Sequence, residues 1–375
     1  MHARPQERGF ALAGAVFSLV IIAALVVGAF FASRPELNIG RASQTYQRAF
    51  QVAEASMNKQ VALWNTSANA LTVGDSLMAY DTITGSGGGT AVTSIKRLNT
   101  QLFLLRTTGT SGTSSRTLAQ MTRLQLINMN FLASLTTQGS IQVGGSSFID
   151  GRDTPPPGWS CPAPTDTVAA IRTPDSTSIT TSGCNSYSCL FGTPKIDQDT
   201  TVADSTFFQF GNLDWAGLVA MATKVYPGNT GPLNALAPIA AGSTCNTSLA
   251  NNWGEPWRIV GSISQCNNYL PIIYVNGNLQ LTGGRGQGIL LVEGDLSVQG
   301  GFEFYGPVIA RGQFDTQGTG GHFNGGVMAA NVNLQVNNIL GNALITYSSC
   351  AISRALQFNA SGRGLRERSW AEINQ

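Results

Sequence analysis

Charged residues and histidine are scarce in this sequence. Only 11% of the 375 residues are charged, the net charge is +2, and the two histidines are His2 and His322. A net charge this small does not indicate a nucleic-acid-binding surface. No two cysteines have the CxxC spacing typical of zinc ligands, and two histidines so far apart do not supply such a site. We therefore expect no nucleic-acid partner, no metal and no cofactor.

Catalytic motifs are missing as well. His322 lies in a Gly-rich loop without a GxSxG sequence to partner it, and the glycine run at 283–288 lacks a Walker lysine. Several carboxylates flank turn glycines, where acidic residues are ordinary solvated turn residues: Asp150, Asp153, Glu293, Asp295, Glu303 and Asp315. Such groups could instead act as an acid–base pair or bind calcium. We expect no catalytic residue and no enzyme activity.

One long uncharged run is present near the N-terminus, at residues 10–32. About 20 apolar helical residues span a bilayer, so this run is long enough to cross a membrane. A fair signal-peptidase site occurs only at Val27-Gly28-Ala29, and the apolar run continues beyond it. Arg4 and Arg8 precede the run, which orients the N-terminus toward the cytoplasm. We expect a single-pass protein of the cytoplasmic membrane with an extracytoplasmic head from Arg34 onward.

Two short motifs resemble a known family. Arg8-Gly9-Phe10-Ala11-Leu12 resembles the prepilin-peptidase site of type IV pilins and type II secretion pseudopilins. Residues 47–55, QRAFQVAEA, resemble the AFQAAEAA stretch of PilX-type minor pilins. The resemblance covers residues 1–65 and implies cleavage after Gly9, an N-methylated Phe10 as the mature N-terminus, and a retained apolar helix. It implies a structural, non-enzymatic subunit of a type IV pilus or related pseudopilus.

The sequence departs from the family at the fifth mature position, where Gly14 replaces the usual Glu. In pilins this carboxylate is thought to pair with a neighbouring subunit's N-terminal amine, because an intramembrane charge is costly unless it is paired. PilX-type pilins and the GspK-type tip pseudopilins also tend to lack the Glu. The departure therefore favours a minor subunit at a tip or initiator position.

The resemblance also implies the partners. They are other pilins and pilus assembly proteins, the inner membrane before assembly, and the prepilin peptidase. After assembly the head would lie on the pilus or cell surface, where it could attach to a surface or host ligand. Two alternatives stay open: a signal-anchored extracytoplasmic β-helix adhesin, and a β-helix carbohydrate-active enzyme. An exposed carboxylate cluster in a groove would favour the enzyme.

The predicted fold class is α+β, mainly β, because the chain is rich in Gly, Ser, Thr and Asn. Residues 1–9 are the expected leader, and residues 10–65 the expected membrane and amphipathic helix, kinked at Pro35. Apolar residues from Ile39 to Trp64 recur with the helical spacing. Residues 66–130 are predicted to be a pilin-like strand region. Within it, two strands joined by a Gly/Ser/Thr turn at 109–115 are expected to form one antiparallel pair.

A repeat of alternating apolar residues fills much of the C-terminal half. Its turn positions hold Gly or Asn: Gly139, Gly277, Gly294, Gly312 and Asn331. The last four are 17, 18 and 19 residues apart. This spacing suits the rungs of a parallel β-solenoid, which we expect at 131–350, with inward-facing side chains such as Leu290 and Val308. A meander of hairpins is the alternative, because Asn276-Gly277 is a good hairpin signal.

All six cysteines follow the apolar run: Cys161, Cys184, Cys189, Cys245, Cys266 and Cys350. An even number in an extracytoplasmic location predicts disulfides. Cys245 and Cys266 close a short loop and are the best single pair, whereas the pairing of the other four stays open. Residues 154–268 open with a Pro-rich breaker and are predicted to leave one end of the solenoid and cap it. Residues 351–375 are expected to be a solvated tail.

Overall fold

The computed structural model describes residues 8–85, 88–164, 167–211, 213–330, 337–365 and 370–373. These residues are mostly β-strand, with a long N-terminal helix and two short further α-helices. The chain forms two compact units. The first contains Met1–Leu124 and Gly362–Gln375, and the second contains Gln125–Ser361. The second unit is therefore an insertion within the chain of the first.

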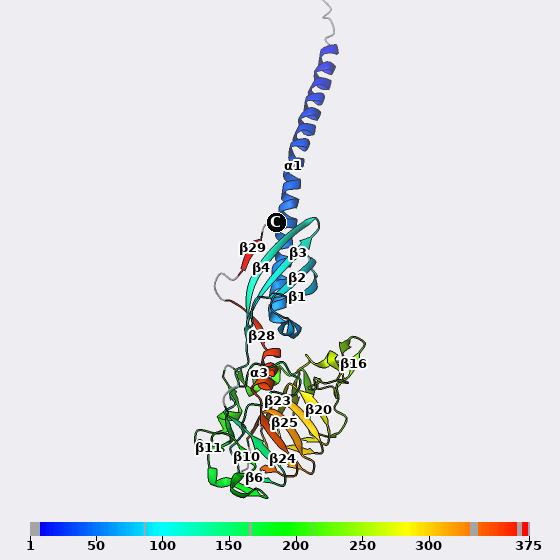
Figure 1. Cartoon of the computed structure of the whole chain (residues 1–375). Coiled ribbons are helices and arrows are strands. Elements are labelled where there is room, and N and C mark those ends of the chain that lie inside the picture. The colour runs from blue at the N-terminus through cyan, green and yellow to red at the C-terminus, as the bar shows by residue number, and fades with distance from the viewer. Residues whose placement is uncertain are drawn as a thin grey trace, which may run out of the picture. The chain divides into compact units, whose positions relative to one another are not determined.

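The first unit begins with helix α1, Arg8–Ala62, which is continuous for 55 residues (Figure 1). Pro35 lies inside α1 and does not end it. The second half of the helix buries small and apolar residues with helical spacing: Ala49, Val52, Ala53, Ser56 and Met57. A short 3-10 helix, η1 (Thr66–Ala70), follows. The helix thus has the extent expected from the sequence, ending three residues before position 65.

Four antiparallel strands follow α1 and pack against its second half: β1 (Ser76–Ile83), β2 (Gly89–Arg97), β3 (Leu102–Ser111) and β4 (Ser114–Gln125). Side chains alternate between the helix side and the outer side. On β3, for example, Phe103, Leu105 and Thr107 are buried. The strands β3 and β4 include the antiparallel pair that the sequence predicts.

The C-terminal residues do not form the solvated tail that the sequence suggests. They form helix α3 (Ser349–Phe358), then β28 (Ser361–Gly364) and β29 (Trp370–Ile373). Strand β29 runs antiparallel to β4, with Trp370 opposite Gln120 and Ile373 opposite Thr117. The reason is physical: the backbone groups along the edge of β4 need hydrogen-bond partners, and the returning chain provides them.

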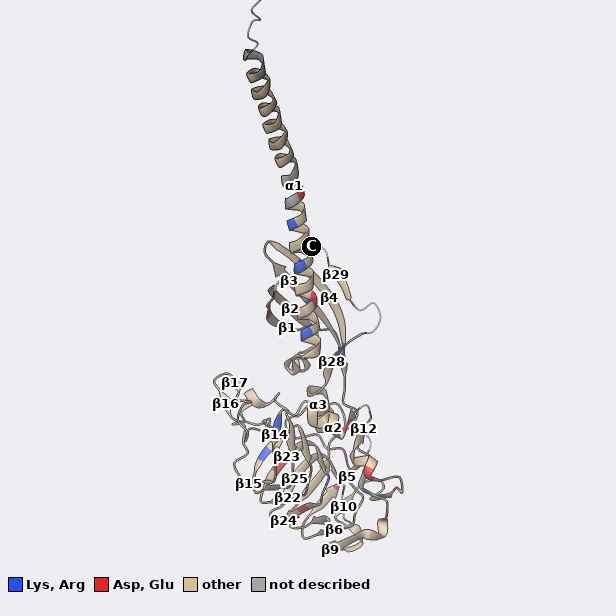
Figure 2. Cartoon of the chain, turned by 180° about the vertical axis from the view of Figure 1, so that it is seen from behind, with Lys and Arg blue, Asp and Glu red and all other residues tan. Residues whose placement is uncertain are grey.

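Two parallel sheets organise the second unit. We call the seven-stranded sheet row B. In spatial order it contains β15 (Thr230–Leu233), β19 (Leu279–Leu281), β22 (Leu296–Gln299), β24 (Phe314–Gln317), β26 (Asn337–Ile339), β6 (Ile141–Gly144) and β9 (Ile179–Ser182). Figure 2 labels β15, β22, β24, β6 and β9 of this row.

The larger sheet branches into two rows, because β23 (Phe302–Ala310) and β25 (Gly321–Ala329) are each nine residues long and contribute to both. Row A contains β14 (Lys224–Tyr226), β18 (Ile272–Val275), β21 (Ile289–Val292), the second halves of β23 and β25, then β5 (Ala133–Thr137), β8 (Ala169–Thr173) and β11 (Ile196–Gln198). Row C contains β20 (Gly284–Gln287), the first halves of β23 and β25, then β27 (Leu344–Tyr347), β7 (Phe148–Asp150) and β10 (Leu190–Phe191).

Equivalent repeat positions lie opposite one another in row A. Ile273 pairs with Leu290, Leu290 with Val308, and Val308 with Val327. All four are almost fully buried in one apolar cluster with residues of rows B and C. The hairpin alternative is wrong, because β18 and β19, on either side of Asn276-Gly277, lie in different sheets and pair with other strands in parallel.

The turns between rows A and B stack on one another. The Gly294 N–H donates to the Gly277 carbonyl, and the Gly312 N–H donates to the Gly294 carbonyl, both at 3.0 Å. A Cβ at Gly312 would lie 2.6 Å from the Gly294 carbonyl carbon, so this close stacking requires glycine. Beside the glycines, Asn278 Oδ1 accepts from the Asp295 N–H at 2.9 Å. Gly139 lies in the bend between β5 and β6, whereas Asn331 lies outside the described residues.

Residues 154–268 are not a single excursion outside the sheets. Strands β8 to β11 (169–198) extend rows A, B and C beyond β5 to β7, and β14 and β15 (224–233) begin rows A and B at the other end. The early repeat copy at 133–150 therefore lies in the middle of the stack, with Leu135 opposite both Val327 and Ile171. The sequence missed these strands because they are short and lack the regular period.

The outer surface of row A is covered. Ile272, Ile289, Leu291 and Ile309 face outward and form a second buried cluster. The covering residues come from segment 127–131, from 202–221, which includes helix α2 (Trp215–Ala220), and from α3. Because both surfaces of row A are buried, its strands are apolar on consecutive residues, as in Ile289–Val292.

Candidate functional site

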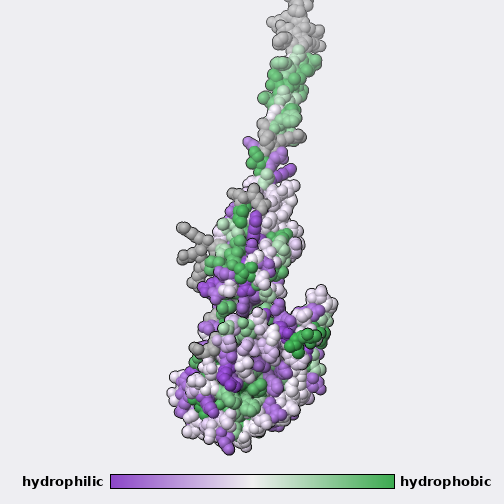
Figure 3. Space-filling view, viewed as in Figure 1, coloured by the Kyte–Doolittle hydropathy of each residue, from purple (hydrophilic) through white to green (hydrophobic). Residues whose placement is uncertain are grey.

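The most exposed apolar surface of the described chain is the first half of α1. Leu12–Phe31 spans 20 residues with a mean hydropathy of 2.6, and none of it is buried within the protein. Leu12 is 73% exposed and Phe17 67% exposed. By length and composition this segment is able to cross a membrane, and Figure 3 shows it as an almost continuous hydrophobic band. Burying a large apolar side chain is worth about 1.5–3 kcal/mol, so covering this surface with lipid or other apolar helices would be favourable.

The predicted processing residues, Gly9 and Phe10, lie in the first turn of α1. Four residues further along the helix is Gly14, where an added Cβ would meet no atom within 4 Å. A side chain at position 14 would therefore not collide with the rest of the chain. The Ser18 hydroxyl donates to the Gly14 carbonyl at 2.8 Å, which is a hydrogen bond within the helix.

The second half of α1 approaches the sheet closely at Gly109 on β3. A Cβ at Gly109 would lie 2.4 Å from the Ala53 nitrogen and 2.5 Å from the Ala49 oxygen. The helix and the strand can touch only because all three residues are small. Ala49 and Ala53 belong to the stretch 47–55 that resembles the minor pilins, so that stretch supplies the contact with the sheet.

A buried polar network links α1 to β1. Asp81 is 8% exposed and accepts hydrogen bonds from Lys59 Nζ at 2.5 Å, from Ser56 Oγ at 2.7 Å and from Gln60 Nε2 at 2.7 Å. Burial by itself raises the pKa of this carboxyl, but the hydrogen bonds from Lys59, Gln60 and Ser56 lower it more, so its pKa lies below the usual value. The ionised carboxylate thus fixes the end of the helix on the sheet.

A groove lies beside the same half of α1, with a cavity volume of about 150 Å³. Its walls come from α1, β4 and β29: Phe50, Glu54, Met57, Asn58, Leu118, Gln120 and Trp370. The Phe50 and Trp370 rings lie edge to face, with 6.4 Å between their centroids. The groove contains one carboxylate and no other ionisable side chain.

The carboxylates singled out in the sequence do not gather into one group. Each forms hydrogen bonds of its own: Asp150 with Arg152, Asp153 with Ser349, Glu293 with Arg311 and Trp215, Asp295 with the Gln313 N–H, Glu303 with Trp257 and Tyr305, and Asp315 with Gln313 and Asn338. Among the described residues no group of three His, Cys, Asp or Glu side chains is placed to hold a metal ion. These contacts give the carboxylates structural roles in turns and between strands.

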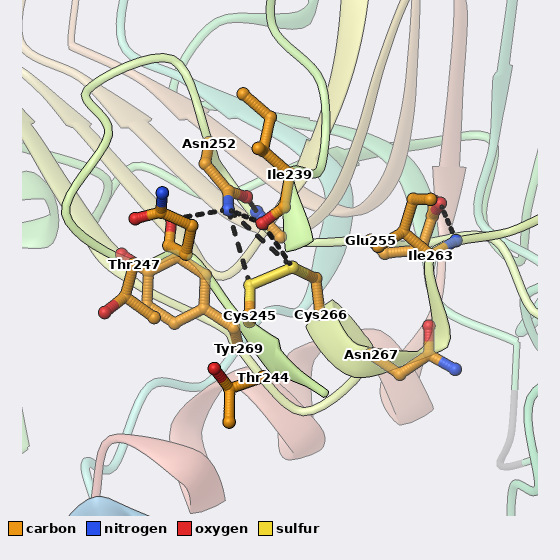
Figure 4. The surroundings of a disulfide bond; sticks show 12 residues. Ile239, Thr244, Cys245, Thr247, Asn252, Glu255, Ile263, Cys266, Asn267 and Tyr269 are labelled. Carbon is orange, nitrogen blue, oxygen red and sulfur yellow. Dashed lines mark hydrogen bonds between the residues drawn. A yellow bond between two sulfur atoms is a disulfide. The ribbon is translucent and has the colours of Figure 1, made fainter. Parts of the chain in front are cut away.

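The six cysteines form three disulfides: Cys161–Cys350, Cys184–Cys189 and Cys245–Cys266. The Cys245–Cys266 pair is the one favoured by the sequence. Figure 4 shows it beside the Asn252 amide, which donates to the Ile239 and Asn246 carbonyls at 3.0 and 2.8 Å. This disulfide lies in the loop next to β14, whereas Cys184 and Cys189 pack with Ile179 and Leu190 at the other end of the apolar cluster.

Sequence reasoning missed a dense group of aromatic and basic side chains at the margin of row C. Trp159 stacks on Tyr305 with 6.0 Å between ring centroids, and the Arg258 guanidinium lies 4.8 Å from the Trp159 ring. Burial lowers the pKa of Arg258 to about 10, with a further contribution from the nearby charge of Arg354. These residues come from distant parts of the chain and share no periodic pattern, so no signal in the sequence brings them together.

Comparison with known proteins gives little further information. No family model matches the chain, and no curated protein matches it. Among solved structures, the crystal structure of the competence-associated pilin ComZ from Thermus thermophilus aligns with 88% of this chain and 97% of its own. The sequence identity is 12% and the TM-score is 0.23, values too low to support an argument about fold or function.

Proposed function

We propose that this protein is a pilin-like, non-enzymatic subunit of a type IV pilus or related pseudopilus. The observation that carries the proposal is the division of α1 into two halves. Leu12–Phe31 is apolar and unburied, whereas Ala49–Met57 is packed on the antiparallel sheet of the first unit. A helix of this kind can be stored in a bilayer and later buried among equivalent helices of a filament.

The motif at residues 8–12 supports the finer part of the proposal. Its resemblance to prepilin-peptidase sites implies that residues 1–9 are removed on the cytoplasmic side and that the helix is retained. The resemblance of residues 47–55 and the absence of Glu at Gly14 favour a PilX-like minor subunit at a tip or initiator position. The head would then take part in assembly or attachment outside the cytoplasmic membrane.

For the second unit we propose a β-solenoid whose successive rungs each contribute one strand to rows A, B and C. Support comes from the parallel pairing of equivalent positions, such as Leu290 with Val308 and Leu296 with Phe314. The stacked turn glycines and the shared apolar interior are also expected of this architecture. The disulfide loops near β14 and at Cys184–Cys189 would close its two ends.

The experiment is to shear surface filaments from cells that produce the protein and to probe them for it. Wild-type protein should appear in the filament fraction, whereas Gly9→Leu should stay in the membrane fraction at its full length. A matched variant, Gly28→Leu, lies in the same helix, away from the proposed cleavage site, and should behave as the wild type. If Gly9→Leu reaches the sheared fraction as well as the wild type, processing after Gly9 is not needed and the pilin proposal is wrong. If the wild type itself stays in the membrane fraction, the pilin proposal is also wrong and a signal-anchored adhesin is favoured.

A further inference from the structure

The three strand rows of the second unit differ in what covers their outer surfaces. Row A lies beneath segment 127–131, α2 and α3. Row B presents mainly short polar and amide side chains, such as Gln280, Ser297 and Gln142. The outward side chains of row C include Glu303, His322 and Phe148, and these stay partly or largely exposed. Row C is therefore the row whose outer surface combines aromatic and hydrogen-bonding groups.

The outward side chains of row C are aligned by the strand register. Glu303 lies opposite His322, His322 opposite Leu344, and Leu344 opposite Phe148. The neighbouring line contains Tyr305, Asn324, Thr346 and Asp150. We call Glu303, His322, Asn324, Leu344 and Phe148 the row C strip. Adjacent strands lie about 4.8 Å apart, so the strip is about 14 Å long from Glu303 to Phe148.

Aromatic rings lie at both ends of the row C strip. At one end the Trp257 indole N–H donates to Glu303 Oε2 at 2.8 Å, and the Arg285 guanidinium lies 3.9 Å from the Trp257 ring. At the other end Phe148 is 43% exposed, and its centroid is 5.9 Å from that of Phe191. Arg152 lies 4.6 Å from the Phe191 ring and also pairs with Asp150.

Between these rings the strip offers free hydrogen-bonding groups. His322 and Asn324 are both partly exposed, and within the described residues neither side chain forms a hydrogen bond. An amide provides two N–H donors and a carbonyl acceptor, and a neutral imidazole provides one of each. A ligand on this surface therefore meets both donors and acceptors in the middle and apolar ring faces at the ends.

Residues 154–161 run along one side of the row C strip and are held in place by several contacts. The Thr154 N–H donates to the Tyr347 carbonyl at 3.0 Å, and Trp159 stacks on Tyr305. The Cys161–Cys350 disulfide anchors the same segment to α3. Residues 154–161 thus form a wall along the Tyr305 side of row C, which limits the directions from which a ligand can approach.

We propose that the row C strip binds an uncharged oligosaccharide of about three sugar units. Sugars present hydroxyl groups that donate and accept, together with C–H faces that stack on aromatic rings. The charges beside the strip largely cancel, since Asp150 pairs with Arg152 and Arg285 pairs with Glu255. Glu303 and Asp153 are balanced by Arg258 and Arg354, which lie 4.8 and 5.3 Å from the Trp159 ring, so this surface offers no net positive charge to a polyanion such as nucleic acid.

The row C strip contains a single carboxylate, Glu303, so we expect binding without cleavage. Hydrolysis of a glycosidic bond usually needs two carboxyl groups about 5–9.5 Å apart. Glu303 and Asp150 lie three strands apart, about 14 Å along the row. Both carboxylates are also held by neighbouring side chains, Glu303 by Trp257 and Asp150 by Arg152. This inference does not depend on the role proposed for α1.

The test is a binding measurement with the full-length protein in detergent. The probes are soluble hexasaccharides of glucose, N-acetylglucosamine, mannose and xylose, together with an acidic hexasaccharide of galacturonate. At least one neutral probe should bind, and Phe148→Ala and Asn324→Ala should each weaken that binding by about tenfold, which corresponds to about 1.4 kcal/mol. Thermal unfolding of each variant shows whether the fold is retained.

The matched control is Gln299→Ala, which removes a partly exposed amide from row B and should leave binding unchanged. The proposal is overturned if no neutral probe binds, if the acidic probe alone binds, or if both row C variants bind as the wild type does. Equal weakening by Gln299→Ala would also overturn it, because the site would not then lie on row C.

Discussion

In the first unit the longest apolar segment, Leu12–Phe31, has no buried residue. In the second unit, by contrast, the inward apolar side chains of rows A, B and C face one another and are almost completely buried. In both units, the spacing of apolar residues along the chain decides which side chains share a face: 3.6 residues in α1 and two residues in the strands. The difference lies in what completes the burial. The second unit buries its repeats against further repeats of the same chain, while no described residue of the chain buries the apolar half of α1.

The largest effect should come from placing a charge inside the second unit. Leu290 is fully buried and pairs with residues on both sides, so Leu290→Asp would bury an unpaired carboxylate and cost more than about 4 kcal/mol. The protein should unfold, as measured by circular dichroism and protease sensitivity. Ser297→Asp, at an outward position of row B, should cost little. Equal damage at both positions would show that the inward and outward positions have been confused.

The disulfides should differ in their contribution to the second unit. Cys161–Cys350 joins residues 189 apart and Cys184–Cys189 residues five apart. In the chain-entropy model, removing the first costs about 5 kcal/mol and removing the second about 2 kcal/mol. Urea unfolding of the two double Ser variants compares them directly. A larger loss from the short loop would mean that chain entropy does not dominate here.

In the first unit, the stability should depend on the size of the side chain at position 109, where β3 lies closest to α1. Gly109→Val would push side-chain atoms into the backbone of Ala49 and Ala53, at a cost of about 1–3 kcal/mol. Thr110→Val, at a partly exposed position on the opposite side of β3, is the matched control and should have a small effect. Thermal unfolding monitors both. An unchanged midpoint for Gly109→Val would contradict the close approach.

The smallest effect concerns Asp81 and depends on pH. Because the pKa of Asp81 is lowered in the folded protein, its contribution to stability is complete above the unfolded pKa of about 3.9 and is lost as the pH falls toward the folded value. Asp81→Asn should cost about 1–2 kcal/mol at pH 7 and progressively less below pH 4. Urea midpoints at pH 7 and pH 3 measure this. A constant difference at both pH values would rule out the ionised network.

Periodic features could be read from the sequence, and contacts between distant segments could not. The spacing of apolar residues gave the extent of α1, and the alternation around Gly277, Gly294 and Gly312 gave the positions that stack in row A. The strands at 169–198 and 224–233 were missed because each is short and irregular, and their pairing depends on neighbours far away in the chain. The return of β29 to β4 was missed for the same reason.

Of the two candidate functional surfaces, one could be predicted from the sequence and the other could not. Composition alone identified the uncharged run at residues 10–32, which contains Leu12–Phe31, because a membrane-length apolar run needs no tertiary information. The row C strip needed the structure, since Phe148 and His322 lie 174 residues apart (322 − 148) and become near neighbours only through the register of β7, β27 and β25.

The intact mass of the mature protein tests the central claim most directly. If α1 is a processed pilin-like helix, the mass should correspond to residues 10–375 with three disulfides and one added methyl group at Phe10. Release of fragments by a protease and their sequencing should then place Phe10 at the N-terminus. A mass corresponding to the chain from Met1, or to a chain that begins after Ala29, would contradict the account.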